Sequence, residues 1–523
     1  MKNIKLFTIF SVLSAVTLFT SCNPTSSDYI SAVPKEPIAA LKINAGALFD
    51  DSKILENNLV NNYLRQAINE MPRDMRSIMR DILAEPSNSG IDVDKPAVFV
   101  LDGVTPLRGL VCCAVGNKEQ LNDNIEEFLD ETDNLNIQAE DGYTVVSDRR
   151  NVWVAFDDEK LVVALSEGVA DATEYMKMSE NALSNSNFCK FVGSNDDAGL
   201  YLDYTQLSTI AASVSPQNRE LIQTLEMYDG VIQFTSLNFD DGRVVMRSSL
   251  EGNTAVISEY IKAMNKTPSG KYLEYVPKDA YGVALLGLQN LTKSFELLDN
   301  KIRKEFEQLM TQMNFDMQLI DDIDGDVLFA LLPRADLAGK QLPQMIFFAE
   351  SKKGLFDYVA TALLGNNKNM SQVATDLYSL GLNKRIDWSK SSYNYDTYSY
   401  DYVYTTSGYD YYLGYIDDCI FVMPENIYAK CVKDGEFVAL RKNFSDSPLT
   451  VYLDKSAVVC GMDNIIEDCK DLEPAFTDIL KYFESVRVLS TDVFDSEFVI
   501  EFADKDVNSL KQIVDIAMRN IPK

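Results

Sequence analysis

The sequence contains no histidine, and this absence excludes several kinds of active site. Catalytic triads with a histidine base, zinc sites with imidazole ligands and imidazole acid–base catalysis are all ruled out. The Gly-x-Ser-x-Gly and Ser-x-x-Lys patterns of serine nucleophiles are also missing. The composition therefore favours a protein that is not an enzyme, and no cofactor or metal is expected.

The sequence also has no uncharged hydrophobic run of the roughly 20 residues that a membrane-spanning helix needs. Its N-terminus instead has two lysines followed by a short apolar segment at 6–19, which is the layout of a secretory signal. We predict that residues 1–21 are a signal peptide.

The apolar segment leads into LFTSC at 18–22, which is similar to a lipobox, where small residues precede a cysteine that becomes acylated. Phe19 stands where a lipobox usually has leucine, and an ordinary signal peptide with an incidental cysteine is the alternative. We predict lipidation at Cys22 and a lipidated tether over 22–31, because this stretch is polar and rich in breakers. The acyl chains would anchor the protein to a membrane of the cell envelope, in a periplasmic or outer-membrane-facing position.

Basic residues are few: the chain has 48 Lys and Arg but 79 Asp and Glu, so its formal net charge is −31. This charge repels anionic polymers, so no nucleic-acid partner is expected. Hydrophobic residues make up 46% of the chain, which is enough for substantial cores, and the length suggests more than one domain.

The eight cysteines form no Cys-x-x-Cys pair, so a redox or metal motif of that type is absent. Cys112 and Cys113 lie in the apolar run GLVCCAV, where neighbouring side chains of a strand point to opposite faces. We expect buried free thiols. A disulfide such as Cys460–Cys469 is the alternative that an oxidising envelope permits.

Four sequence matches in the same order indicate a tandem duplication. AVPK at 32–35 is echoed by YVPK at 275–278, and DVDKPAVFVL at 92–101 by DIDGDVLFAL at 322–331. A third pair shares Tyr-Leu-Asp, and the fourth pair starts at 227 and 482. We place repeat domain 1 at 32–268 and repeat domain 2 at 271–523, with Pro268-Ser269-Gly270 as the linker.

Each repeat combines strand-like alternation with helix-like periodicity. In repeat domain 1, alternation predicts strands at 38–43, 152–156, 161–165 and 231–239. A helix with one apolar face is predicted from residues that recur four apart: Leu55, Leu59, Tyr63 and Ala67. Asn117 and Gln120 resemble a capping box before a second helix.

Hairpin-type connections between these strands imply antiparallel pairing. The predicted fold class is therefore α+β, with two tandem homologous repeats, each an antiparallel sheet with helices packed on one face.

The lipobox-like start, the VPK opening of each repeat and the stretch GIDVDKPAVFV at 90–100 resemble a family of large lipoproteins from Bacteroidetes-type bacteria. That family is known only as a domain of unknown function. The resemblance covers most of the chain after the signal peptide, and it implies export and a duplicated architecture. It implies no activity.

A tyrosine-dense stretch at 391–415 is largely peculiar to repeat domain 2. Four tyrosines recur every second residue and would line one face of a strand, and two more would continue that face across a turn. These candidates are Tyr398, Tyr400, Tyr402 and Tyr404, then Tyr409 and Tyr411. An exposed row of rings suits stacking on sugars or docking on a protein. A hairpin whose tyrosines cover the edge of their own core is the alternative.

Acidic turns are the remaining candidates. The DIDGD sequence at 322–326 has the spacing of calcium ligands, but it lacks the later ligands of a calcium loop, and an acidic turn before a buried strand is the favoured interpretation. Pairs such as Asp157-Asp158 and Asp417-Asp418 suit hairpin turns. Two carboxylates brought close together could instead serve a glycan hydrolase.

The leading hypothesis is a non-enzymatic envelope lipoprotein that acts as a binding or assembly component for another envelope protein or a glycan. A glycan-binding module or a carboxylate-based glycan hydrolase is the alternative. A cleft that holds one carboxylic acid of raised pKa beside an ionised partner would favour the hydrolase.

Overall fold

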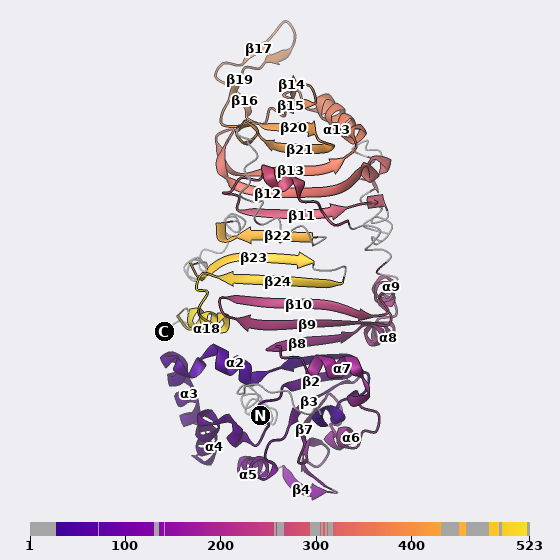
Figure 1. Ribbon diagram of the computed structural model, residues 1–523, viewed down its shortest axis with the longest axis vertical. Helices are drawn as coiled ribbons and strands as arrows, with labels where there is room; N and C mark the ends of the chain where they lie inside the picture. The colour runs from indigo at the N-terminus through magenta and orange to yellow at the C-terminus, as the bar shows by residue number, and fades with distance from the viewer. Residues whose placement is uncertain are drawn as a thin grey trace. The chain divides into compact units, whose positions relative to one another are not determined.

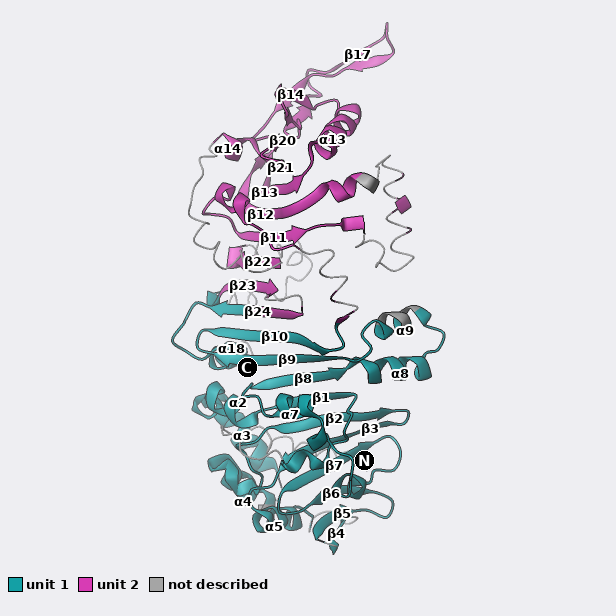
Figure 2. Ribbon diagram, turned by 45° about the vertical axis from the view of Figure 1, so that its right-hand side comes forward, with its two compact units in different colours: residues 1–254, 475–483, 499–523 teal, residues 255–474, 484–498 magenta. Residues whose placement is uncertain are grey.

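The computed structural model describes residues 28–71, 73–129, 135–140, 142–255, 258, 266–292, 304, 307–308, 311, 317–429, 449–456, 481–490 and 494–519. The chain forms two compact units, coloured separately in Figure 2. Unit 1 contains residues 1–254, 475–483 and 499–523, and unit 2 contains residues 255–474 and 484–498. The fold is α+β, with a large antiparallel sheet, as predicted.

Among the residues that the structure describes, the strands β1 to β10 lie wholly in unit 1 (Figure 1). They are β1 (Ala39–Ile43), β2 (Ala97–Val104), β3 (Leu107–Ala114), β4 (Asn136–Glu140), β5 (Tyr143–Ser147), β6 (Val152–Phe156), β7 (Lys160–Ser166), β8 (Ala198–Asp203), β9 (Val231–Asp240) and β10 (Arg243–Gly252). β1 lies between β2 and β8, and β3 lies between β2 and β7. The antiparallel neighbours continue from β7 through β6 and β5 to β4, and from β8 through β9 to β10.

Helices lie against both faces of this sheet, where one covered face was predicted. The helices of unit 1 are η1 (Asp28–Ala32), α2 (Ala45–Ser52), η2 (Ile54–Glu56), α3 (Asn58–Glu70), α4 (Arg73–Ala84), η3 (Pro86–Ser89), α5 (Lys118–Leu129), α6 (Ala172–Met176), η4 (Ala182–Ser184), α7 (Ser186–Val192), α8 (Tyr204–Val214), α9 (Arg219–Glu226) and α18 (Ser509–Arg519). Cys112 of β3 packs in a core with η1, α6 and α7, whereas its neighbour Cys113 packs in another with α4 and α5. Alternate residues of one strand thus serve two cores, which is why neighbouring apolar residues are both buried.

Unit 2 also combines antiparallel strands with helices. Its strands are β11 (Gly282–Leu288), β12 (Ile323–Leu337), β13 (Lys340–Ser351), β14 (Ser371–Ala374), β15 (Leu377–Ser379), β16 (Lys384–Ile386), β17 (Ser392–Asn394), β18 (Ser399–Asp401), β19 (Tyr404–Thr406), β20 (Tyr411–Ile416), β21 (Cys419–Pro424) and β22 (Leu449–Asp454). β23 (Phe483–Ser490) and β24 (Asp495–Phe502) each have residues in both units. The helices are η5 (Lys271–Tyr275), η6 (Met317–Asp322), α13 (Lys353–Asn366) and α14 (Glu425–Tyr428).

The core of unit 2 lies between β11, β12, β13 and β21 and the short helix η5, where Tyr272 stacks on Phe348 with ring centroids 5.1 Å apart. A second cluster joins α13 to β20 and β21. β11 lies between β12 and β22, and β13 lies between β12 and β21.

Several local predictions are confirmed. β1, β6, β7 and β9 form where alternation predicted strands, and α5 begins after Asn117, whose Oδ1 accepts a hydrogen bond from the Gln120 backbone N–H at 3.1 Å. α3 forms within the predicted helical segment, but its predicted apolar face is wrong, because Leu59 and Tyr63 are exposed. Val60 and Ile68 are buried instead.

The thiols of Cys112, Cys113, Cys189 and Cys419 are free. All but Cys189 are buried, as predicted, and burial raises the pKa of Cys113 and of Cys419 to about 12. Such thiols are poor nucleophiles. The predicted signal peptide, Cys22, and the cysteines at 431, 460 and 469 lie outside the described residues.

Candidate functional site

The first part of the predicted tyrosine stretch forms a hairpin that projects from the rest of unit 2, as Figures 1 and 2 show. β17 pairs with β18, and β16 pairs with β19 below them. The turn between β17 and β18 is held by Asn394, whose Oδ1 accepts hydrogen bonds from the backbone N–H groups of Asp396 and Thr397. Tyr398 has a φ of 52°, a left-handed conformation that closes the turn.

The rings on this hairpin pack on one another. Tyr400 and Tyr402 stack with centroids 5.7 Å apart, and Trp388 meets both edge-on at 6.0 and 5.8 Å. Tyr393 contacts Tyr400 at 5.1 Å and Tyr395 at 5.0 Å. We call these five residues, with Tyr398 and Tyr404, the aromatic cluster.

The aromatic cluster is exposed to solvent in spite of these contacts. Tyr395 and Tyr398 keep about four-fifths of their surface accessible, at 79% and 82%, and Trp388 keeps 65%. Tyr400, Tyr402 and Tyr404 are 45–49% exposed. Large exposed aromatic surface of this kind marks binding sites.

The predicted row does not extend to Tyr409 and Tyr411, which are 7% and 6% exposed. These two rings contact each other, and the Tyr411 hydroxyl accepts a hydrogen bond from the Met345 backbone N–H at 3.0 Å. β20 begins at Tyr411 and is an inner strand of unit 2, and burial within the unit separates this pair from the aromatic cluster.

Trp388, Tyr393 and Tyr395 were missed by the sequence analysis. Period-two spacing identifies residues on one face of a single strand. Trp388 instead joins the cluster from the loop before β17, Tyr393 from β17 and Tyr395 from the turn. The available signal was compositional, because Trp388 is one of only two tryptophans in the chain and adjoins the tyrosine-dense stretch.

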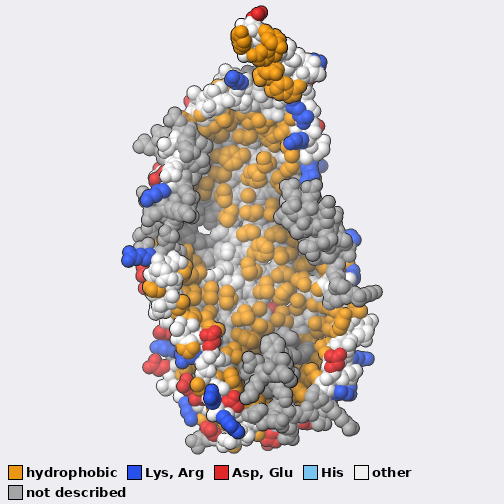
Figure 3. Space-filling view, turned by 180° about the vertical axis from the view of Figure 1, so that it is seen from behind, with side chains coloured by type: hydrophobic (Ala, Val, Ile, Leu, Met, Phe, Trp, Pro, Cys, Tyr) orange, Lys and Arg blue, Asp and Glu red, His pale blue; other side chains and the backbone are white. Residues whose placement is uncertain are grey.

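A second apolar surface lies on the sheet of unit 1. Leu41 of β1 is opposite Phe99 of β2 and Leu200 of β8, and Gly109 of β3 is opposite Leu165 of β7. Together with Leu101, Leu107 and Trp153 they line a groove of about 620 Å³. Figure 3 shows that apolar side chains gather over the strands in each unit and that charged ones lie mainly at the margins.

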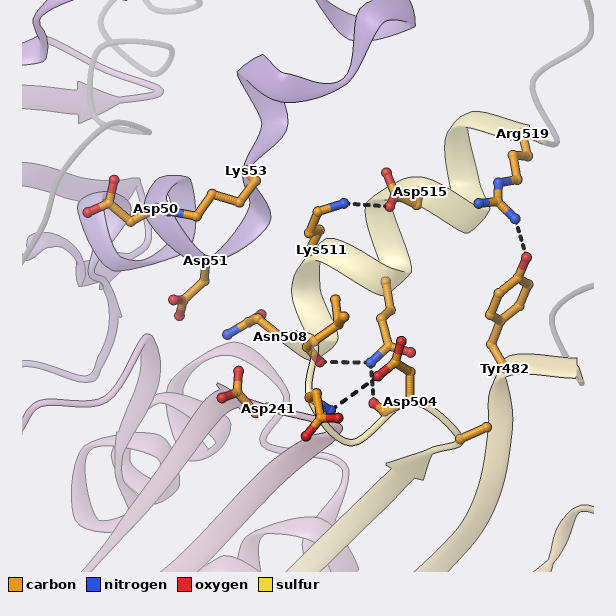
Figure 4. Close-up of a pocket in the computed structure, with 14 residues that line it drawn as sticks. Asp50, Asp51, Lys53, Asp241, Tyr482, Asp504, Asn508, Lys511, Asp515 and Arg519 are labelled. Atoms are coloured by element: carbon orange, nitrogen blue, oxygen red, sulfur yellow. Dashed lines mark hydrogen bonds and ion pairs between the residues drawn. The ribbon is translucent and has the colours of Figure 1, made fainter.

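A polar pocket of similar volume, about 620 Å³, lies elsewhere in unit 1 (Figure 4). Its walls come from the end of α2, the β9–β10 turn, and the loop and helix at 503–519. The lining contains six aspartates and three basic residues, namely Asp50, Asp51, Asp241, Asp504, Asp506 and Asp515 with Lys53, Lys511 and Arg519. We call it the acidic pocket.

Backbone hydrogen bonds join the segments that form the acidic pocket. Gly242 donates to Val507 O at 2.9 Å and accepts from Phe502 N at 2.8 Å. Asn508 Nδ2 donates to Phe239 O at 2.5 Å, and its Oδ1 caps α18 by accepting from Leu510 N. Gly242 has a φ of 67°, and a Cβ there would lie 2.6 Å from Lys505 Cα. The close approach of the β9–β10 turn to Lys505 therefore requires glycine.

Crowded carboxylates disturb the ionisation of this region. Burial, then the neighbouring charge of Asp50, raises the pKa of Asp51 above its usual value, although a hydrogen bond from Asn508 opposes this. Burial also raises the pKa of Asp197 to about 6, with a contribution from Asp51. Burial and like charge therefore disfavour the ionised forms of Asp51 and Asp197.

Replacing Asp197 by asparagine is expected to stabilise unit 1 at pH 8. The folded state holds the Asp197 proton up to about pH 6, whereas the unfolded chain releases it near pH 4, so wild-type stability is lost as the pH rises between these values. The asparagine variant avoids this loss of about 3 kcal/mol and can still accept from Phe239 N. Urea titrations at pH 4 and pH 8 test this, and an equal difference at both values would contradict it.

The acidic motifs noted in the sequence have structural partners. Asp326 accepts hydrogen bonds from Ser269 N, Ser269 Oγ and Gly270 N. Asp322 forms an ion pair with Lys352, and Asp324 forms one with Lys266. Within the part of the chain that the structure describes, no group of three acidic or cysteine side chains is placed to hold a metal ion. The prediction of an acidic turn before the strand is wrong, because Asp322 ends η6 and residues 323–326 already belong to β12, where Asp326 lies opposite Gly287 of β11.

The acidic pairs between strands are hairpin turns. Asp157 Oδ1 accepts from the backbone N–H groups of Glu159 and Lys160. Asp417 and Asp418 both have positive φ, at 49° and 60°, which is the geometry of a tight two-residue turn that favours aspartate.

No helix within the described ranges has the length and apolar character to cross a membrane. The family model described as Domain of unknown function (DUF4836) matches residues 29–510. No curated protein matches the chain. Two solved structures, crystal forms III and I of TP0453, are similar to part of it at 13% and 12% identity and a TM-score of 0.24, and each alignment covers 46% of this chain and 89% of that chain.

Proposed function

We propose that this chain, which belongs to the DUF4836 family, is a lipid-anchored protein of the bacterial cell envelope that binds a partner through the aromatic cluster. The observation that carries the proposal is the exposure of seven aromatic side chains on one projecting hairpin. The anchor is the predicted acyl group on Cys22.

An isolated two-stranded hairpin is marginally stable in water, and ring contacts such as those of Trp388, Tyr400 and Tyr402 compensate for this. Stability alone does not require Tyr395 and Tyr398 to remain about 80% exposed at the tip. Tyrosine and tryptophan provide rigid contact area with a polar edge, and they are the residues that dominate binding energy in protein interfaces.

The favoured partner is another envelope protein, and a glycan is the alternative, since both are recognised by exposed rings. The acidic net charge of −31 argues against an anionic polymer.

We also infer that the two halves arose by duplication, as repeats at 32–268 and 271–523. The neighbours of β1 are β2 and β8, and those of β11 are β12 and β22, in corresponding order. The order of the remaining neighbouring strands also corresponds: it is β3–β7–β6–β5–β4 in unit 1 and β13–β21–β20–β15–β14 in unit 2. The aromatic cluster is then an insertion in the second repeat, between the counterparts of β5 and β6.

The triple variant Trp388→Ser, Tyr400→Ser, Tyr402→Ser is expected to reduce partner affinity at least about tenfold, because anchor side chains of this type contribute most of the energy of an interface. The measurement is a pull-down of the full chain from its native envelope in mild detergent, followed by titration of the recovered partner. Tyr63→Ser in unit 1, which removes a tyrosine that is 52% exposed, is the matched control.

A partner that is recovered equally with the triple variant and the wild type would refute the proposal. A wild type that recovers no protein but binds on a glycan array, with loss in the triple variant, would select the glycan alternative.

A further inference from the structure

The acidic pocket is not used by the proposed function, which rests on unit 2. All of its lining residues belong to unit 1, so its role can be argued separately. Its volume of about 620 Å³ is in the range of small-molecule sites and far exceeds the size of a single ion.

The charges of this pocket are not balanced. Lys511 pairs with Asp515 at 2.8 Å, and Asp515 also accepts from Asn57 Nδ2 at 3.1 Å. Arg519 donates to the Tyr482 hydroxyl and lies over that ring. Within the described parts of the chain, by contrast, no ion pair involves Asp50, Asp241 or Asp506.

Gln512 provides an independent sign of a ligand. This residue lines the pocket and is only 6% exposed. Its Nε2 donates to the carbonyl oxygens of Asp504 and Val507, both at 2.8 Å, which fixes the orientation of the amide. Its Oε1 is buried and receives no hydrogen bond from any described residue, and a buried acceptor of this kind costs about 1–3 kcal/mol.

Apart from the ammonium group of Lys53, the groups of the pocket without an ion pair or hydrogen-bond partner among the described residues are thus mainly acceptors, namely carboxylates and one amide oxygen. A ligand that complements them carries positive charge and several N–H donors, which describes a primary ammonium group. Figure 4 shows Asp51 and Asp241 on either side of Asn508, at the end of the pocket away from Arg519. The lining has three more acidic than basic side chains, so a cation is favoured over an anion.

We propose that the acidic pocket of unit 1 binds a linear polyamine, whose ammonium groups donate to its carboxylates and to Gln512 Oε1. The volume accommodates an aliphatic chain between two ammonium groups. Binding relieves the mutual repulsion of the aspartates and is strongest above the pH at which Asp51 ionises.

The test is calorimetric titration of the full chain with spermidine at low salt. We expect saturable binding that weakens about tenfold in Asp241→Asn and further in the double variant with Asp51→Asn, because each removes a charge within a few ångströms of the ammonium group. Bound spermidine should also raise the unfolding midpoint of unit 1. Unfolding is monitored by the fluorescence of Trp153 in a Trp388→Phe background.

Asp158→Asn is the matched control, since it removes the same charge from a side chain of unit 1 that is 81% exposed and lies outside the pocket. Equal weakening by Asp158→Asn and Asp241→Asn would show a diffuse attraction and overturn the proposal, as would the absence of saturable binding. The proposal would also be overturned if the wild type hydrolyses a chromogenic glycoside and Asp51→Asn abolishes this activity, because the pocket would then be a site of carboxylate catalysis. Loss of partner binding through the aromatic cluster does not affect these outcomes.

Discussion

Replacing Lys42 by methionine is expected to lower the free energy of unfolding of unit 1 by about 3–5 kcal/mol, because it removes one member of a buried, hydrogen-bonded charge pair. Lys42 is fully buried in β1. Its Nζ donates to the carbonyl oxygens of Phe191 and Ser194, both at 2.9 Å, and lies 3.5 Å from Asp196 Oδ2.

Methionine fills a similar volume but donates no hydrogen bond, so the carbonyl oxygens of Phe191 in α7 and of Ser194 lose the Lys42 donor, although Ser194 Oγ still donates to Phe191 O. The expected loss therefore comes from polar groups left without partners and not from a cavity. Burial lowers the pKa of Lys42, and Asp196 partly opposes this, as expected for an ammonium group held inside by its acceptors.

Urea unfolding followed by Trp153 fluorescence, in a Trp388→Phe background, isolates unit 1, because Trp153 and Trp388 are the two tryptophans of the chain and Trp153 belongs to this unit. Lys35→Met, at an exposed lysine, is the control and should leave the midpoint nearly unchanged. Similar small effects of both variants would show that the Lys42 contacts contribute little.

Replacing Asp326 by alanine is expected to destabilise unit 2 by about 3–5 kcal/mol, since three hydrogen bonds to a buried carboxylate are lost together. Asp326 is 2% exposed, and it accepts from Ser269 N and Gly270 N at 2.7 Å and from Ser269 Oγ at 2.8 Å. These bonds hold residues 269–270 against β12, just before η5 enters the core through Tyr272 and Leu273.

Hydrogen exchange of η5 and β12 measures this effect within unit 2, because local opening of the 269–275 segment exposes their amides. Asp324→Ala is the control, since its carboxylate makes a single surface ion pair with Lys266 at 3.1 Å. If Asp326→Ala exchanges no faster than Asp324→Ala, the segment is held by the apolar contacts of η5 alone.

Local patterns predicted the elements that depend on neighbours in the sequence. β1, β6, β7 and β9 follow from alternation, and the start of α5 follows from the Asn117 cap, because strand pleat and helix capping involve residues only a few positions apart. The predicted turn at Asp157-Asp158 likewise forms, because Asp157 Oδ1 accepts from the backbone N–H groups of Glu159 and Lys160.

Predictions failed where burial depended on distant parts of the chain. α3 has apolar residues on more than one side, and the side with Val60 and Ile68 is buried because it meets other elements of unit 1. Tyr409 and Tyr411 continue the spacing of the exposed tyrosines, yet they are buried because β20 is an inner strand of unit 2. Spacing identifies which residues share a face and leaves open what that face contacts.

The sequence by itself determined the α+β class, the DUF4836 family membership and the location of the tyrosine-dense stretch, because each depends on residue order and composition. Only the tertiary structure decided which side chains form the sites. Trp388 joins the tyrosines by folding of the hairpin, and Asp51, Asp241 and Gln512 line one pocket although they lie far apart in the chain. Contacts of such long sequence separation arise from packing of whole elements, which no local pattern encodes.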